Sequence, residues 1–186
     1  RTHCRVRIWS AGTVNSLEAA WHRLGITADH LAACRLPAYP EATRLVDAGC
    51  DLFGRPQQMT RTTLAAWLAM RAAARNDSIE LQLVSAYRSV AYQCDVIERK
   101  LAAGRSIDEI LRVNAPPGHS EHHTGRALDL TSPGVEALTE AFETTDAFAW
   151  LSRRAEAFGF ALSYPRDNPE GIDYEPWHWA RHADPA

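Results

Sequence analysis

Two short stretches, far apart in the chain, hold residue types that can bind a divalent metal and move a proton. The first contains His122 and Asp129, and the second, near the C-terminus, contains Glu175 and His178. A catalytic zinc ion usually takes three protein ligands and keeps its fourth position for water or substrate. His122, Asp129 and His178 would supply the three ligands. Glu175 is then left to take a proton from the water, which is the division of labour in a metallohydrolase.

The backbone must bring these side chains together, because they are not neighbours in any regular element. His122 and Asp129 are seven positions apart, too far for one helical turn. We expect His122 on a loop that folds back over a strand bearing Asp129, with the bend at Thr124–Gly125, since glycine tolerates unusual backbone angles. Glu175 and His178 would face opposite sides of a regular strand. We therefore expect a bulge or turn between them.

The other histidines are expected to have structural or surface roles, because a lone histidine is more often one of these than a ligand. His123 is adjacent to His122 and should point away from the metal. His182 is the second choice for the C-terminal ligand, although few residues follow it to fix its place. The remaining histidines are His3, His22, His30 and His119.

Hydrophobic spacing predicts an α+β fold, with a small antiparallel sheet that carries the zinc site and is flanked by helices. Predicted helices cover residues 16–24, 27–34, 60–75, 89–103, a short stretch from 106, 135–144 and 147–158. Predicted strands cover residues 79–84, 127–130, 160–164 and 173–180. The first strand alternates apolar and polar residues, which predicts one buried face. The helix at 89–103 should place Tyr92, Val96 and Ile97 on one face.

Composition favours one ordinary globular unit. The chain has 186 residues, of which 46% are hydrophobic and 23% charged, enough to bury one good core. We divide it into an N-terminal helical extension, residues 1–40, packed on a catalytic domain, residues 41–186. The net charge of −3 and the dispersed basic residues argue against a nucleic-acid partner. No apolar run reaches the ~18 residues of a transmembrane helix.

The cysteines and the first residue bear on compartment. The four cysteines, Cys4, Cys34, Cys50 and Cys94, form no CxxC pair. Their even number favours an oxidising compartment with at least one disulfide, although scattered buried thiols would give the same sequence. Arg at position 1 indicates a processed chain whose signal or anchor has been removed. We therefore expect a periplasmic or extracellular protein of the cell envelope. The sequence leaves the oligomeric state open, and a monomer is favoured.

The motifs also resemble a known family. Ser-x-His-x-x-Gly-x-Ala-x-Asp at 120–129 and Glu-Pro-Trp-His at 175–178 are similar to the zinc D-alanyl-D-alanine carboxypeptidases and dipeptidases of the VanY/VanX type, the LAS-type metallopeptidases. Ser-Ala-Tyr-Arg-Ser at 85–89 resembles their third signature. The resemblance covers roughly residues 41–182, and residues 1–40 match nothing that we can place.

The resemblance implies roles for individual residues. It implies Zn²⁺ on the two histidines and Asp129, Glu175 as the catalytic base, and peptidoglycan stem peptides as the substrate. Arg88 is the only cation in the third signature, and its paired donors suit an anionic substrate end or a tetrahedral oxyanion. Gln93 could add a polar contact or lie on the surface. Ser120 could bind substrate or shape its loop.

Three readings remain open from the sequence. The first is a carboxypeptidase that removes the terminal D-Ala of stem peptides. The second keeps the zinc chemistry but cuts another bond, as an L,D-carboxypeptidase or a peptidoglycan endopeptidase. The third is a non-catalytic zinc-containing binding module similar to Hedgehog signalling domains. Such a module could lose the base or the arginine, whereas this chain keeps both Glu175 and Arg88.

Overall fold

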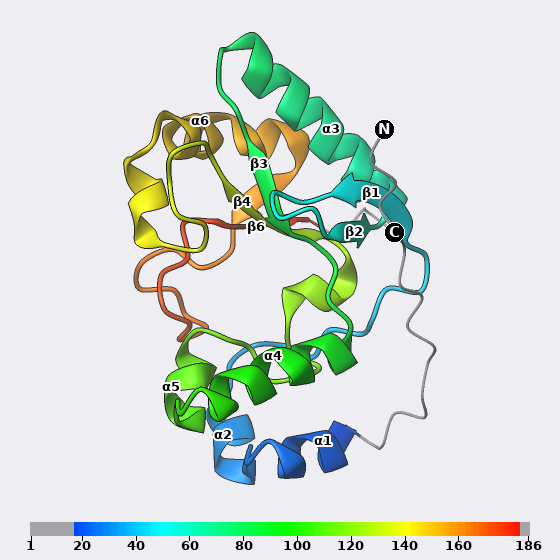
Figure 1. Ribbon diagram of the computed structural model, residues 1–186, viewed down its shortest axis with the longest axis vertical. Coiled ribbons are helices and arrows are strands. Elements are labelled where there is room, and N and C mark those ends of the chain that lie inside the picture. The colour runs from blue at the N-terminus through cyan, green and yellow to red at the C-terminus, as the bar shows by residue number, and fades with distance from the viewer. Residues whose placement is uncertain (1–16, 183–186) are drawn as a thin grey trace.

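The computed structural model of the protein describes residues 17–182, and it confirms the predicted α+β class (Figure 1). The α-helices are α1 (Leu17–Arg23), α2 (Ala28–Ala33), α3 (Arg61–Asn76), α4 (Val90–Ala102), α5 (Ile107–Arg112) and α6 (Asp146–Arg154). The strands are β1 (Val46–Cys50), β2 (Pro56–Met59), β3 (Gln82–Ser85), β4 (Ala127–Thr131), β5 (Phe160–Leu162) and β6 (His178–Arg181). Short 3-10 helices are η1 (Glu121–Thr124), η2 (Glu140–Thr144) and η3 (Ala155–Phe158).

The central sheet is antiparallel, with strand order β3-β4-β6-β5. Strand β4 lies inside the sheet and is buried at every position. In the pairing of β4 with β6, Asp129 lies directly opposite His178. On the other side of β4, Ser85 at the end of β3 also pairs with Asp129. Directly opposite residues place their side chains on the same face of a sheet, so the register alone brings Asp129 and His178 together.

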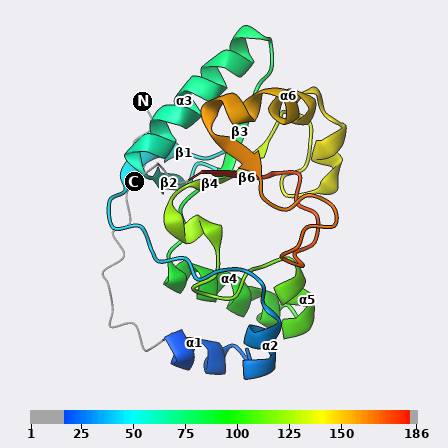
Figure 2. The same cartoon turned by 180° about the vertical axis from the view of Figure 1, so that it is seen from behind.

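Two apolar cores lie on either side of the sheet. Both views place α3 and α6 on one side, and α4, α5, α1 and α2 on the other (Figures 1 and 2). The larger core fills the space between the sheet, α3 and α6, and includes Trp67, Leu128 and Phe160. The second core joins α1, α4 and α5, and Leu31 of α2 packs against its edge; its buried residues are Ala20, Leu24, Ile26, Cys94, Ile97 and Ile110. Helix η1 lies between these two layers in both views.

Helices α2, α3 and α5 have a side-chain cap at the first residue of the range predicted for them. Thr27 and His30 form a capping box on α2, and Thr60 caps α3. Ser106 and Glu109 form the capping box of α5.

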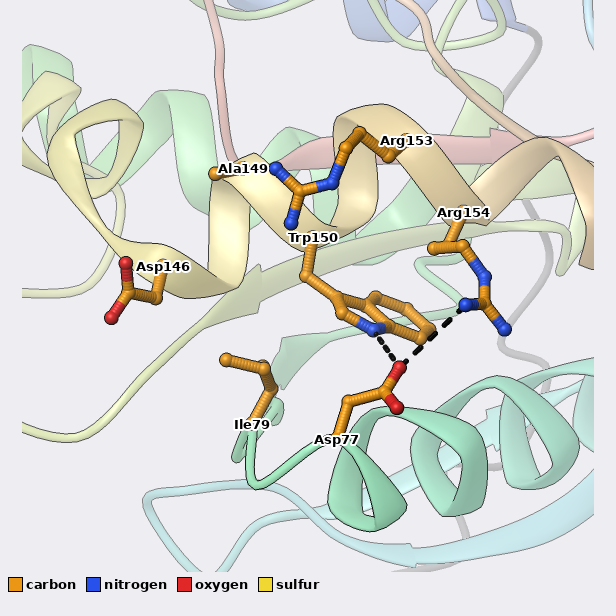
Figure 3. A pocket seen from close by; sticks show the side chains of 7 residues that line it. All are labelled: Asp77, Ile79, Asp146, Ala149, Trp150, Arg153 and Arg154. Carbon is orange, nitrogen blue, oxygen red and sulfur yellow. Dashed lines mark hydrogen bonds and ion pairs between the residues drawn. The ribbon is translucent and has the colours of Figure 1, made fainter.

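The end of α3 is tied to α6 beside a surface pocket, where Asp77 accepts a hydrogen bond of 2.7 Å from Trp150 Nε1 (Figure 3). This pocket contains none of the predicted site residues.

The N-terminal segment packs against the loop that leads into the predicted metal motif. Trp21 Nε1 donates to the carbonyl of Pro117 at 2.9 Å. Tyr39 N donates to Gly118 O, and Ala42 N donates to His123 O, each at 2.8 Å. Residues 17–42 therefore cover the second core and contact residues 117–123, the segment called the metal loop from here on.

Several predicted elements were wrong in extent. Residues 135–144 form turns and the short η2 rather than one helix. Strand β3 is shorter than predicted, and Val84 is as buried as Leu83 because both faces of the strand are covered. Strand β6 begins only at His178. On α4, Tyr92 is exposed, while Gln93, Cys94 and Ile97 are buried. The β1–β2 hairpin was not predicted.

Two further findings concern cysteines and membranes. No disulfide joins Cys34, Cys50 and Cys94 to one another, so the expected bridge is absent among these three. Cys4 lies outside the described residues. No helix within residues 17–182 has the length and apolar character needed to cross a bilayer.

Candidate metal centre

Three side chains from three different elements meet inside the molecule. One ligand atom from each of His122, Asp129 and His178 lies within 4.8 Å of the other two. His122 Nε2 is 3.3 Å from Asp129 Oδ1, and His178 Nδ1 is 3.1 Å from the same oxygen. The three residues are only 1–3% exposed. Two imidazoles and a carboxylate converging at one buried point form the donor set of an open zinc site.

His122 reaches this point because its loop turns back at Gly125, as the sequence predicts. Gly125 ends η1 with φ 66°, in the left-handed region. A Cβ at this position would lie 2.8 Å from Leu45 Cδ2 and 3.3 Å from the backbone nitrogen of Thr60. Only glycine combines this backbone angle with such close packing. The bend delivers the chain directly into β4 and Asp129.

Hydrogen bonds on the remote ring nitrogens fix which nitrogen of each histidine faces the cluster. His122 Nδ1 donates to the carbonyl oxygen of Ala86 at 2.5 Å, which leaves Nε2 for a metal. His178 Nε2 lies 2.9 Å from Glu121 Oε2, which leaves Nδ1. Such a partner on the second nitrogen is typical of metal-ligating histidines.

Electrostatics favour a cation at this point. Burial lowers the pKa of His122 to about 4, so its imidazole is neutral. Burial alone would raise the pKa of Asp129, but the neighbouring His122 and Arg88 hold it well below its usual range. Although burial disfavours its charge, hydrogen bonds to Asp129 and Glu121 raise the pKa of His178 to about 10. A proton on His178 Nδ1 therefore sits where a divalent ion would bind, and metal binding would displace it.

Glu175 lies beside the cluster without belonging to it. The expected turn is present, since His178 N donates to Glu175 O at 3.1 Å, and Oε2 of Glu175 is 3.7 Å from His178 Nδ1. The side chain is buried, and burial raises its pKa to about 7. A carboxylate with such a pKa is poised to exchange protons near neutral pH.

Arg88 also reaches the cluster. Its guanidinium contacts the carboxylate of Asp129, and its Nε donates to Ser85 Oγ at 3.0 Å. The side chain is 18% exposed, so its donors stand at the edge of the site. In the structure, Arg88 therefore contacts a predicted ligand directly.

Gln93 and Ser120 are both buried, which excludes a surface position for Gln93. Gln93 Nε2 donates to Ala115 O at 2.9 Å, while its Oε1 is buried without a hydrogen-bond partner. Ser120 precedes η1, but its hydroxyl does not cap that helix. The structure therefore leaves one polar atom of Gln93 and the Ser120 hydroxyl free of these local structural bonds.

Within residues 17–182, the other histidines lie outside the cluster, and His3 falls outside the described residues. His123 accepts from Gly118 N at 3.1 Å through Nε2 and donates to Arg88 O at 2.7 Å through Nδ1. It thereby ties the metal loop to the segment bearing Arg88. His182 is exposed, and His119 Nδ1 contacts backbone carbonyls of the N-terminal segment.

Glu121 was not predicted as a site residue. This residue is adjacent to His122, yet its carboxylate contacts the other histidine, His178, across the site. Only the fold brings them together, so no spacing in the sequence marks the contact. The one available indication was an acidic residue next to a predicted ligand, which by itself is common.

Comparison with known proteins agrees with this geometry. A sequence profile of the VanY family, described as D-alanyl-D-alanine carboxypeptidase, matches residues 56–183. The chain is 40% identical over 113 residues to a Bacillus subtilis (strain 168) protein named as carboxypeptidase YodJ. That match covers 57% of this chain and 40% of the relative, so the chain spans well under half of that protein.

Solved structures share the fold. The LdcB LD-carboxypeptidase superposes with a TM-score of 0.67 and 31% identity, covering 78% of this chain and 71% of that one. VanYB in complex with D-alanine-D-alanine gives a TM-score of 0.60 and 26% identity, covering 78% and 80%. The profile match spans β2 through β6 and contains the complete cluster of His122, Asp129 and His178. The chain therefore belongs to the VanY family of D-alanyl-D-alanine carboxypeptidases.

Proposed function

We propose that this protein is a zinc-dependent D,D-carboxypeptidase that hydrolyses the terminal D-Ala of peptidoglycan stem peptides. The observation that carries the proposal is the buried convergence of His122, Asp129 and His178, with Glu175 beside them. Zinc fits because the donors are two imidazole nitrogens and one carboxylate. Family membership supports the substrate class, and VanYB has been solved with D-Ala-D-Ala bound.

The proposed mechanism assigns one task to each side chain. Bound zinc would polarise the scissile carbonyl and lower the pKa of a water molecule towards ~7. Glu175 takes the proton from the attacking water and returns it to the leaving amine. Its burial, which raises its pKa to about 7, suits both transfers.

Arg88, Ser120 and Gln93 form the proposed substrate-binding group. The Arg88 guanidinium would pair with the C-terminal carboxylate of the peptide or with the developing oxyanion. Gln93 and Ser120 are buried, at 1% and 4% exposure, so a bound peptide would engage the unpaired Oε1 of Gln93 or the Ser120 hydroxyl only after local rearrangement. This arrangement supports an exopeptidase, since a guanidinium near the metal favours an anionic chain end.

A second candidate keeps the chemistry and changes the bond. The LdcB LD-carboxypeptidase shares the fold at 31% identity. An L,D-carboxypeptidase would shorten tetrapeptide stems, whereas the proposed enzyme would shorten pentapeptide stems. A peptidoglycan endopeptidase would instead separate cross-linked dimers.

Mass spectrometry of defined muropeptides separates these functions. Pentapeptide, tetrapeptide and cross-linked substrates are incubated with zinc-loaded protein and, in parallel, with the Glu175→Gln variant. The proposal expects loss of one D-Ala from the pentapeptide by the wild type, and a loss of at least ~10²-fold in rate for the variant. Cleavage of the tetrapeptide alone would replace it with the L,D activity. Stoichiometric zinc without any hydrolysis would favour a binding module.

Further proposals concern the domain organisation, oligomeric state and location of the protein. We propose that residues 41–186 act as the catalytic domain, that residues 1–40 form an extension packed on it, and that the protein works as a monomer. Stem peptides lie outside the cytoplasmic membrane, so we place the protein in the periplasm or extracellular cell envelope. Detection in an envelope fraction, and a single monomeric mass by light scattering, test these statements.

A further inference from the structure

We infer that Glu121 is a positioning residue for the metal ligand His178, holding its imidazole so that Nδ1 faces the other two ligands. The inference rests on the proposed metal site and adds a residue to it. Glu121 Oε2 lies 2.9 Å from His178 Nε2. The Glu121 side chain is 19% exposed and that of His178 only 4%, so the contact is shielded from solvent.

The orientation of the His178 ring determines which of its nitrogens faces the other two ligands. The two nitrogens of an imidazole point in different directions. Nδ1 of His178 lies 3.1 Å from Asp129 Oδ1 and 3.7 Å from Glu175 Oε2, while Nε2 faces Glu121. A metal at Nδ1 replaces the contact with Asp129 but leaves the contact with Glu121 intact. Glu121 therefore selects the nitrogen that binds the metal.

Removing the carboxylate leaves a buried donor without a partner. An unsatisfied buried N–H is costly, so the ring would rotate or take the other tautomer. Either change withdraws Nδ1 from the cluster. Because Glu121 and His122 are consecutive in η1, one short helix supplies a ligand and also orients the opposite one.

Glu121 is itself held by the N-terminal segment. The Tyr39 hydroxyl donates to Glu121 Oε1 at 3.4 Å. Tyr39 additionally donates its backbone N–H to Gly118. It belongs to the segment that precedes the family match, which starts at residue 56. The N-terminal extension thus contributes to the order of the metal site.

Zinc affinity measured by competition with a chelator tests the inference. Glu121→Ala should weaken zinc binding by ~10–100-fold, the usual effect of losing such a partner. Glu121→Gln keeps an acceptor oxygen and should fall between Ala and wild type. Tyr39→Phe loses only a long hydrogen bond and should change affinity by less than the Ala variant. Glu170→Gln is the matched control, because it removes a charge that faces Tyr39 and Tyr164, and it should bind zinc as the wild type does.

A spectroscopic readout distinguishes positioning from general structure. NMR of zinc-loaded protein with ¹⁵N-labelled histidine should show His178 as the Nε2–H tautomer. The Nε2 proton should exchange slowly with solvent in the wild type and rapidly in Glu121→Ala. Wild-type zinc affinity in Glu121→Ala, or the Nδ1–H tautomer in wild type, would overturn the inference. Failure of the wild type to bind zinc would instead refute the proposed function. If Glu121→Ala does not fold, Glu121→Gln decides: zinc affinity below that of the wild type supports the inference, and wild-type affinity overturns it.

Discussion

Replacing Gly125 with alanine tests how the backbone delivers His122 to the metal site. Gly125 is buried at the end of η1 with φ 66°. An alanine there adopts a left-handed conformation at a cost of ~1–3 kcal/mol. Its Cβ would also stand 2.8 Å from Leu45 Cδ2 and 3.3 Å from the Thr60 backbone nitrogen. The leucine methyl can rotate away, but Thr60 is the fixed cap of α3.

Gly134 provides the matched control for this substitution. It has φ 83°, is exposed, and a Cβ there would meet nothing within 4 Å. Gly134→Ala should therefore lose only the backbone contribution, whereas Gly125→Ala should lose a further ~1–3 kcal/mol from overpacking. Each kcal/mol lowers Tm by roughly 2–4 °C for a chain of this size.

Urea and thermal unfolding of both variants measure the difference. Zinc affinity is measured on the same samples, since displacement of the loop moves His122 and should weaken binding only in Gly125→Ala. Equal unfolding midpoints for the two alanine variants would show that Gly125 is not held against Leu45 and Thr60. Lower stability with unchanged zinc affinity would show that the bend does not place His122.

The remaining predictions address the chemistry. Glu175→Gln should retain stoichiometric zinc by elemental analysis and lose ~10²–10⁴-fold in turnover. Because Glu175 must be ionised to act as a base, and burial raises its pKa, wild-type kcat/KM should fall on the acid side of neutrality, and a flat acid limb would contradict this role. Arg88→Ala should lose ~10²–10³-fold in kcat/KM on pentapeptide, while Arg153→Ala, in the distant pocket of Figure 3, should lose none. Dialysis against a chelator should abolish hydrolysis, and added Zn²⁺ should restore it; full activity in metal-free protein would exclude the proposed mechanism.

Features of this fold that depend on local sequence could be predicted. The caps at Thr27, Thr60 and Ser106 are local interactions, so the residues that begin α2, α3 and α5 could be predicted from sequence. The bend at Gly125 could be predicted for the same reason. The turn between Glu175 and His178 followed from the period of a strand, which cannot place both on one face.

Features that depend on tertiary packing could not be predicted. Val84 is buried because the sheet is covered on both sides, which alternation within β3 does not reveal. The β1–β2 hairpin lacks a regular apolar pattern, since most of its residues are exposed or half-buried. The contacts of Glu121 with His178, and of Arg88 with Asp129, join residues 57 and 41 positions apart. Residue types alone identify the candidates, and only the fold pairs them.

Anomalous diffraction at the zinc edge, from crystals grown with one equivalent of Zn²⁺, would locate the ion itself. We expect a single strong peak bounded by His122 Nε2, an oxygen of Asp129 and His178 Nδ1, with Glu175 nearby and outside the coordination sphere. A peak at another position, or His122 and His178 too far apart to share one ion, would contradict this expectation.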